Sequence, residues 1–352
     1  MKQSVIRTLP TAVAAIVAIL SGPAAQAHTP AAGCWHRPGA QTLEEIAVRA
    51  ANRQRRHDQA AATHPGAATL ALSNPMTVAK AAYGAGLLVG WGETGNRPEF
   101  STVTAVGASA LVAPFAFIGA AGDQKIADLF VCRATSFAQI AERAAAGLDA
   151  ATMAAIARKH QAGGRLLVAL PRSAARKATV WNLGSLAAEG TPQARDLMRR
   201  ILLAAVDLTT FIDPATAPVP VGSLTERNLT FRQLGAGEPF LHPGDAHPRA
   251  TFLIHNGVLF PDETISYMAD RKAIPGAPPA QPRVVAAYDF FQADAARTDI
   301  FVASPRPRLP IRQSGAFDAM YLRALFEDSY RQGIFSREWR RTLVDTVRSY
   351  MP

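Results

Sequence analysis

A glycine turn with a nearby serine is the first candidate for chemistry in this sequence. Residues 103–115 read VTAVGASALVAPF, which predicts a short β-branched strand, a sharp turn and an apolar helix. Hydrolases place a nucleophilic serine on such a turn, in the pattern G-x-S-x-G, because the bend exposes the side chain. Here the bend reads Ala105-Val106-Gly107-Ala108-Ser109, so the glycines and the serine have exchanged places. The pattern predicts an elbow that has lost its nucleophile.

A serine–histidine pair is the alternative source of a nucleophile. Ser109 follows the bend by two residues, and His255 stands at the end of a later predicted strand. A serine needs a neighbouring base such as histidine to become nucleophilic. The plainer interpretation makes Ser109 a small packed helix residue, since it lies half a helical turn beyond the bend. His255 is then an ordinary histidine at a strand end.

Metal chemistry is not expected. None of the eight histidines stands in an H-x-x-x-H or H-E-x-x-H spacing. His242 and His247 flank Asp245 in a polar loop, which surface polarity explains. We therefore predict no metal site and no cofactor.

The elements that must position these residues alternate between strands and helices. Buried strands are predicted at 66–72, 163–170, 177–181, 251–260 and 283–291, besides the strand before the turn. Helices are predicted at 79–91, 149–160, 192–206, 318–332 and 336–350, besides the one after the turn. This alternation favours an α/β fold with a mainly parallel sheet covered on both faces.

The first 27 residues predict a secretory signal peptide. Lys2 and Arg7 precede an apolar run at 11–20, and Ala25-Gln26-Ala27 fits the cleavage pattern. The run is too short for a stable membrane anchor, and no other segment has about 18 uninterrupted apolar residues. We expect an exported protein, periplasmic or associated with the envelope. An N-terminal segment with one helix (28–65) and a single large domain (66–352) would follow.

The two cysteines, Cys34 and Cys132, leave two alternatives open. Export permits a disulfide between them, although the sequence does not establish that they are close. Residues 31–34, AAGC, also form a weak lipidation box with Cys34 as the acylated residue. Simple cleavage is favoured, because Pro23 and Pro30 separate this box from the apolar run.

Composition and net charge indicate which classes of binding partner suit this protein. The chain has 352 residues, 49% of them hydrophobic, and a net charge of +10. Such a charge suits an anionic surface such as a phospholipid bilayer, although a solvated basic surface is the plainer explanation. The basic residues are spread along the chain without an aromatic–basic motif, so we expect no nucleic acid partner.

Two long segments, 80–119 and 165–204, resemble patatin-like phospholipases, in particular the secreted bacterial members. The similarity continues weakly through 254–258 and 317–333 and covers most of the chain from about Leu70. It implies a three-layer α/β/α patatin-like fold with a mainly parallel central sheet. It also implies the family's activity, lipid acyl hydrolysis by a Ser-Asp dyad without a catalytic histidine.

The family's oxyanion loop is rewritten in this sequence. Its glycine-rich turn, G-G-G-x-[RK]-G, falls on residues 76–81 and supplies backbone N–H donors to the developing oxyanion. Met76, Thr77 and Val78 replace the glycines, and only Lys80 matches the pattern. β-Branched residues resist the left-handed conformations that such a turn can require.

The catalytic pair of the family is also replaced. Aligned without gaps, the family's nucleophilic serine falls on Gly107, and the aspartate of its D-G-[GA] motif falls on His255. The resemblance therefore predicts an exported pseudoenzyme that binds a lipid, a membrane surface or a protein partner. The alternative is a divergent serine lipid acyl hydrolase or esterase that uses Ser109 with His255. A third possibility is an envelope-associated interaction protein whose pocket has closed.

Overall fold

The computed structural model describes residues 33–36, 48, 51, 68–73, 78–171, 178–207, 250–256, 299–305, 313–335 and 339. The chain divides into two compact units, Met1–Gly33 and Cys34–Pro352, and all described residues except Gly33 belong to the second. The predicted signal peptide, most of the predicted N-terminal segment, Met76 and Thr77 lie outside the described residues.

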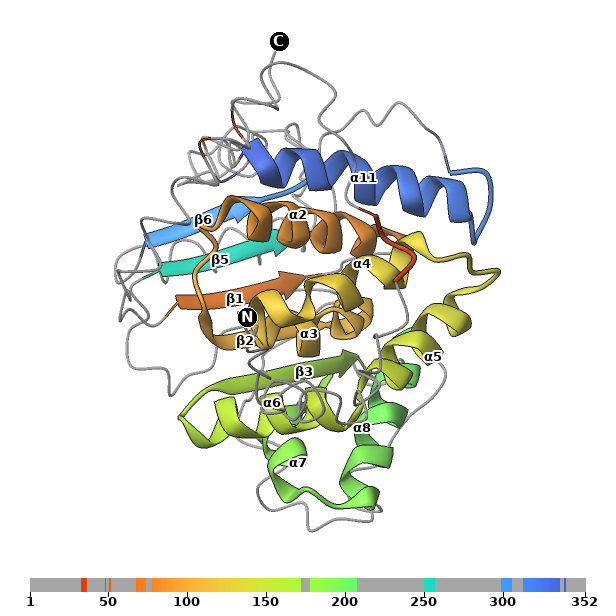
Figure 1. The fold of residues 1–352 in the computed structure, drawn as a ribbon. Coiled ribbons are helices and arrows are strands. Elements are labelled where there is room, and N and C mark those ends of the chain that lie inside the picture. The colour runs from red at the N-terminus through yellow and green to blue at the C-terminus, as the bar shows by residue number, and fades with distance from the viewer. Residues whose placement is uncertain are drawn as a thin grey trace, which may run out of the picture. The chain divides into compact units, whose positions relative to one another are not determined.

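A six-stranded sheet forms the centre of the second unit, in the order β4-β3-β2-β1-β5-β6 (Figure 1). Neighbouring strands are parallel except β3 and β4, which pair antiparallel. The strands are β1 (Ala68–Ser73), β2 (Phe100–Val106), β3 (Arg165–Pro171), β4 (Ala178–Asn182), β5 (Ala250–His255) and β6 (Asp299–Ala303). This agrees with the mainly parallel sheet predicted from the sequence.

Eight α-helices are found among the described residues. They are α2 (Ala81–Thr94), α3 (Ala113–Phe117), α4 (Asp123–Val131), α5 (Phe137–Gly147), α6 (Ala150–Gln161), α7 (Leu183–Glu189), α8 (Pro192–Ala204) and α11 (Ala319–Phe335). Three short 3-10 helices join them: η1 (Val78–Lys80), η2 (Gly107–Leu111) and η3 (Gly119–Gly122). Within the described residues, no helix is long and apolar enough to cross a membrane.

The hydrophobic core lies between one face of the sheet and these helices. Successive strand residues point to opposite faces, and alternate residues such as Leu70, Leu72, Val103 and Ala105 join one buried cluster with side chains of α2 through α8 and α11. The strand residues of opposite parity are also buried, as a sheet covered on both faces requires. The fold is therefore α/β and compatible with a three-layer α/β/α architecture.

Threonines distinguish the second face of the sheet. Thr69 of β1 is in register with Thr102 of β2 and Thr251 of β5, and all three are buried. The hydroxyls of Thr69, Thr251 and Ser73 find no hydrogen-bond partner among the described residues. This face is thus buried but partly polar, whereas the first face is packed with aliphatic and aromatic side chains.

Glycines allow α2 and α11 to pack in close contact. A Cβ atom added to Gly86 or Gly90 of α2 would overlap the backbone carbonyls of Phe326 and Tyr330 in α11. Gly333 of α11 likewise lies against the backbone of α2. This contact fixes the helix that begins at the carboxyl end of β1 and so helps to position the candidate site.

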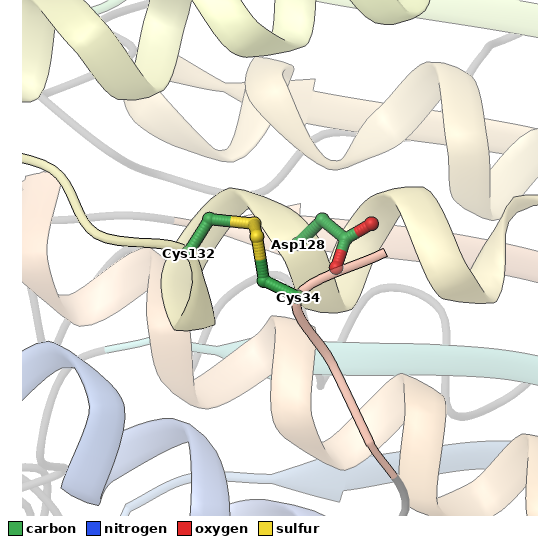
Figure 2. Close-up of side chains that lie close together, drawn as sticks. All are labelled: Cys34, Asp128 and Cys132. Carbon is green, nitrogen blue, oxygen red and sulfur yellow. A yellow bond between two sulfur atoms is a disulfide. The ribbon is translucent and has the colours of Figure 1, made fainter. Parts of the chain in front are cut away.

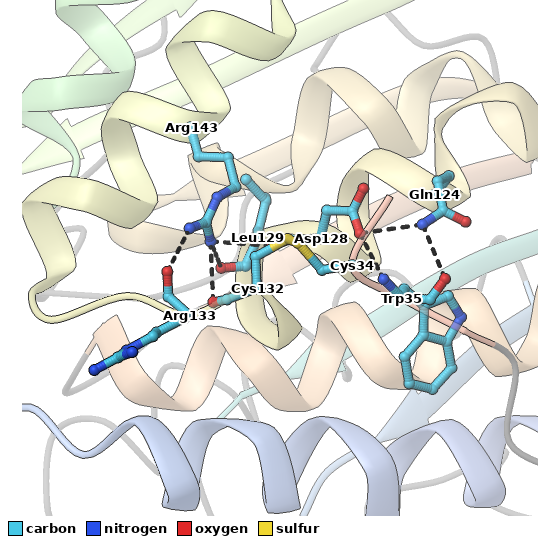
Figure 3. The surroundings of a disulfide bond; sticks show 8 residues. All are labelled: Cys34, Trp35, Gln124, Asp128, Leu129, Cys132, Arg133 and Arg143. Atoms are coloured by element: carbon cyan, nitrogen blue, oxygen red, sulfur yellow. Dashed lines mark hydrogen bonds between the residues drawn. A yellow bond between two sulfur atoms is a disulfide. The ribbon is translucent and has the colours of Figure 1, made fainter. Parts of the chain in front are cut away.

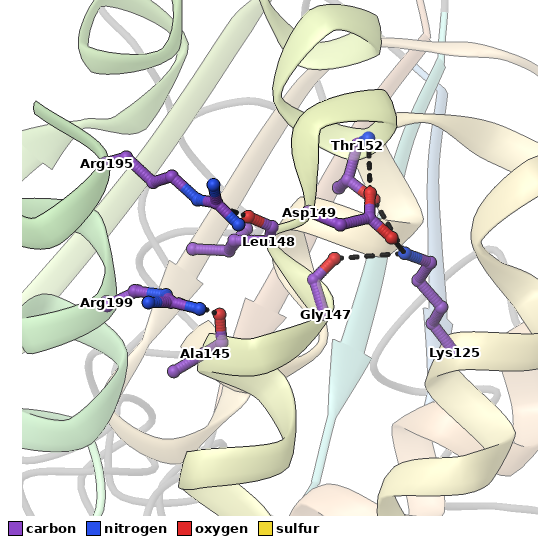
Figure 4. A network of polar contacts seen from close by, with 8 residues as sticks. All are labelled: Lys125, Ala145, Gly147, Leu148, Asp149, Thr152, Arg195 and Arg199. Carbon is purple, nitrogen blue, oxygen red and sulfur yellow. Dashed lines mark hydrogen bonds and ion pairs between the residues drawn. The ribbon is translucent and has the colours of Figure 1, made fainter. Parts of the chain in front are cut away.

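Basic side chains bind the carboxyl ends of the helices. The three residues at the end of α5 show this most clearly (Figure 4): Arg199 donates to the carbonyl of Ala145, Lys125 to that of Gly147 and Arg195 to that of Leu148. The last carbonyls of a helix lack the regular i+4 backbone donor and carry partial negative charge, and the carbonyl of Ala145 additionally accepts from the N–H of Leu148. Arg143 and Lys159 bond to carbonyls near the ends of α4 and α3, whereas Arg97 bonds to a carbonyl within α2 and Arg165 to one in the loop before β3.

Candidate functional site

The carboxyl ends of β1, β2 and β5 form the candidate site. The chain runs from β1 outward through β2 to β3 on one side, and later through β5 to β6 on the other. The strand order therefore reverses between β1 and β5. In open α/β sheets, ligands bind outside the carboxyl ends of the strands at such a point. Ser73, Gly107 and His255 lie at this edge.

The turn after β2 has the backbone of an elbow and glycine at its apex. Val106 is extended (φ −124°, ψ 134°), and Gly107 adopts a left-handed φ of +57°. This conformation is costly for residues with a Cβ atom and easy for glycine. Gly107 begins η2, whose five residues are all buried. The predicted bend is present at Gly107, which offers no side chain for nucleophilic attack.

Ser109 is held by an asparagine. Its side chain is 1% exposed, and its hydroxyl accepts a hydrogen bond from Nδ2 of Asn256 at 3.0 Å. Asn256 is itself buried and accepts from the backbone N–H of Gly84 in α2 at 2.8 Å. Its own N–H donates to the carbonyl of Ser73 at the end of β1. One residue thus joins three elements: its backbone bonds to β1, and its side chain bonds to the turn after β2 and to α2.

His255 points to the other face of the sheet. A Cβ atom built on Gly84 would lie 2.7 Å from Oδ1 of Asn256 and 3.1 Å from Cγ2 of Ile254, so both residues face α2. Because side chains alternate along a strand, His255 between them is directed to the opposite face. The contacts described for Ser109 run to Asn256, and the structure does not bring Ser109 and His255 together as a pair.

The predicted oxyanion loop is only partly described. Val78 and Lys80 form η1, directly before α2. Lys80 occupies the N-cap position of α2 with a helical backbone and without a side-chain cap bond. Burial lowers the pKa of Lys80. Lys80 therefore lies at the helix end nearest to the carboxyl end of β1.

The chemistry available to Ser109 is limited by its partner. A neutral amide donates through nitrogen and accepts through oxygen, but it does not take a proton from a serine near neutral pH. Here the amide nitrogen faces the serine, and the amide oxygen already accepts from Gly84. Ser109 and Asn256 form a closed structural contact rather than a nucleophile and its base.

A pocket of about 400 Å³ lies elsewhere, beside the last turns of α2 and the start of α4. It is lined by Trp35, Val89, Gly92, Glu93, Ala120, Asp123 and Gln124. Asp123 forms a salt bridge of 2.9 Å with Arg97, whose side chain is only 4% exposed. Burial raises the pKa of Asp123 to about 6, although Arg97 acts in the opposite direction. Helix α2 begins near the carboxyl edge of the sheet, where the candidate site lies. The pocket is beside the last turns of α2 and is therefore at the other end of this helix.

Asn256 is not among the site residues predicted from the sequence. Asn256 directly follows His255 in the sequence. Neighbouring residues of a strand point to opposite faces of the sheet, so a prediction that is off by one position names a residue on the other face. The sequence feature that could have indicated this contact is Gly84, because a glycine in α2 leaves room for the Asn256 side chain.

No protein-family model, curated protein or solved structure matches this chain.

Proposed function

We propose that this chain is an exported patatin-fold protein without hydrolase activity, which binds a lipid, a membrane surface or a protein partner. One observation carries the proposal: the elbow after β2 holds Gly107 at its apex, while the nearest serine is buried against an amide. A sharp turn of this kind without a reactive side chain is what loss of a nucleophile would leave behind.

The turn supports the loss of the nucleophile on energetic grounds. A non-glycine residue at a left-handed φ costs about 1–2 kcal/mol. A catalytic elbow accepts such strain because it exposes the nucleophile. Gly107 removes this strain, and at φ +57° it needs no compensation from the surrounding structure.

Ser109 is a poor substitute for the missing nucleophile. A nucleophilic serine needs access to the substrate and a base within hydrogen-bond distance. The Ser109 side chain is 1% exposed, and its described partner is the amide of Asn256. Both facts favour a packing role and argue against the alternative hydrolase with Ser109 and His255.

The cysteines support the export part of the proposal. Cys34 and Cys132 form a disulfide, and such bonds persist mainly in oxidising compartments. The sulfur of Cys34 is then committed to Cys132, which disfavours the lipidated alternative.

The basic charge is weaker support for an anionic partner than the composition suggests. Seven of the described basic side chains donate to backbone carbonyls: Arg97, Lys125, Arg143, Lys159, Arg165, Arg195 and Arg199. These seven side chains therefore have a structural role besides their charge. A protein partner remains as compatible with the proposal as a lipid surface.

Labelling with a fluorophosphonate probe tests whether the site is inactive. The wild-type protein and Ser109→Ala are incubated with the probe, with an active serine hydrolase as the positive control. We expect no labelling of either protein. Labelling that disappears in Ser109→Ala would overturn the proposal in favour of the serine hydrolase. Labelling that persists in Ser109→Ala would overturn it as well, by revealing another nucleophile.

Flotation with vesicles separates the classes of partner. Phosphatidylglycerol and phosphatidylcholine vesicles are compared at low and high salt. Binding to phosphatidylglycerol alone, lost at high salt, would identify an anionic surface as the partner. Equal binding to both would identify an apolar lipid contact, and binding to neither would direct the search to proteins.

A further inference from the structure

Two cysteines and an aspartate lie together at the end of α4 (Figure 2). Cys34 and Cys132 are joined by a disulfide, and a carboxylate oxygen of Asp128 lies within 4.8 Å of both sulfurs. Asp128 lies in the last turns of α4, and Cys132 is the C-cap residue of that helix, whose N–H donates to the carbonyl of Asp128. Cys34 reaches them from the N-terminal segment, in which it is exposed, while the other two are partly buried.

The carboxylate of Asp128 is held in place by its neighbours (Figure 3). Its Oδ1 accepts hydrogen bonds from the backbone N–H of Trp35 at 2.9 Å and from Nε2 of Gln124 at 3.1 Å. Gln124 also donates to the carbonyl of Trp35. Hydrogen bonds of this kind orient the ligands of metal sites.

The segment that carries Cys34 is attached by more than the disulfide. The ring of Trp35 packs edge-on against Phe326 and Tyr330 of α11, with both centroid distances at 5.0 Å. Together with the hydrogen bonds to Asp128 and Gln124, these contacts are expected to keep Cys34 next to Cys132 when the sulfur–sulfur bond is broken. Arg143 adds positive charge beside Cys132, since it donates to the carbonyls of Cys132 and Leu129.

We propose that, in its reduced form, this cluster binds one thiophilic divalent cation such as Zn²⁺ through Cys34, Cys132 and Asp128. Two thiolates and a carboxylate are ligands that Zn²⁺ accepts, with Zn–S distances of about 2.3 Å and Zn–O distances of about 2.0–2.2 Å. Mg²⁺ and Ca²⁺ prefer sites made of oxygen alone. Exposure of Cys34 allows water to complete a tetrahedral site. The proposal is independent of the one for the carboxyl edge of the sheet.

The redox step is a thiol–disulfide exchange. A dithiol reductant supplies two electrons and two protons, so that the bond between the two sulfurs breaks, two thiols form and the reductant becomes a disulfide. The cation then displaces the two thiol protons, which pass to solvent. The metal-bound form would hold the N-terminal segment on α4, as the disulfide does in the oxidised form.

Titration with Co²⁺ tests the site directly. The full chain is reduced with dithiothreitol, separated from it without oxygen, and titrated beside the oxidised protein. We expect one Co²⁺ per chain with a thiolate-to-cobalt absorption band in the reduced protein, and no band in the oxidised protein. Absence of the band in the reduced, folded protein would overturn the proposal.

Asp128→Asn separates the proposed site from a simple pair of thiols. The amide oxygen can still accept from Trp35, but a neutral amide is a much weaker ligand, so affinity should fall about tenfold or more. Asp149→Asn, at an aspartate outside the cluster, should bind Co²⁺ as the wild type does. Equal affinity in Asp128→Asn and wild type would overturn the role of Asp128.

Thermal unfolding provides a readout independent of cobalt absorption. Reduction should lower Tm, because the disulfide joins residues 98 apart in sequence, and Zn²⁺ should restore part of the loss. Near-UV circular dichroism verifies that the reduced protein is folded before each titration. A reduced, folded protein whose Tm does not respond to Zn²⁺ would contradict the proposal.

Discussion

Asn256 is the residue on which the candidate site depends most. Its side chain bridges Gly84 and Ser109, and its backbone N–H bonds to Ser73, so three elements meet at one buried residue. A buried polar group that loses its partner costs about 1–3 kcal/mol. Asn256 is therefore both the described hydrogen-bond partner of Ser109 and a source of stability.

Asn256→Ala should lower the free energy of unfolding by about 2 kcal/mol, because it deprives Ser109 and Gly84 of their buried partner. Urea unfolding measures the loss. Asn182→Ala is a suitable comparison, since it removes a single cap bond to Ser185 at the start of α7 and should cost about 1 kcal/mol. A smaller loss in Asn256→Ala than in Asn182→Ala would contradict the role of Asn256.

Gly107→Ala tests the elbow by its backbone conformation. At φ +57°, alanine should cost about 1–2 kcal/mol in unfolding free energy. Gly119→Ala should cost a similar amount, because Gly119 also has a left-handed φ and open space around a Cβ atom. Gly315→Ala, which has neither strain nor a close neighbour, should be nearly neutral. If all three variants unfold at the same urea concentration as the wild type, the elbow is not strained.

At the scale of elements, the close contact between α2 and α11 depends on glycines, which have no side chain between the two backbones. Gly90 packs directly against the backbone of Tyr330, which cannot rotate away as a side chain could. Gly90→Ala gains helix propensity of about 1 kcal/mol but must push the helices apart. The net loss should be about 2 kcal/mol, measured by urea unfolding with Gly315→Ala as the control. A stabilised Gly90→Ala would show that the two helices are less closely packed.

Elements with local signals were predictable from the sequence. Thr191 and Pro192 predicted the start of α8, and the Thr191 side chain accepts from the N–H of Ala194. The helix predicted at 149–160 is α6, with Asp149 as its N-cap. Such caps depend on residues within one turn of each other, so a sequence pattern can identify them.

Other elements and contacts were not predicted from the sequence, most of them because no local sequence pattern indicates them. Helices α4 and α5 were not predicted, although Ser136 caps α5 and could have marked its start. The pairing of Ser109 with Asn256 joins residues 147 apart in sequence, and the disulfide joins residues 98 apart. Neither of these two contacts can be inferred from composition or periodicity. The antiparallel pairing of β3 with β4 likewise depends on how the intervening chain returns.

At the scale of the whole molecule, a partly buried ion pair is expected to make stability depend on pH. The carboxyl of Asp123 has an ordinary pKa of 3.8, and burial raises it to about 6 in the folded protein despite the salt bridge to Arg97. Between these two values the folded state binds a proton that the unfolded state has released. The contribution of Asp123 to stability should therefore fall as the pH rises from about 4 to about 6.

Comparison of urea unfolding at pH 4, 5 and 6.5 tests this dependence. Asp123→Asn cannot titrate, so the decline that Asp123 causes in the wild type should be absent from the variant. Loss of the partner of Arg97 will also destabilise the variant, but this effect is nearly the same at each pH, because arginine stays charged. Asp196→Asn, which alters an exposed pair with Arg200, should retain the wild-type slope. Parallel slopes in Asp123→Asn and the wild type would show that another group carries the pH dependence.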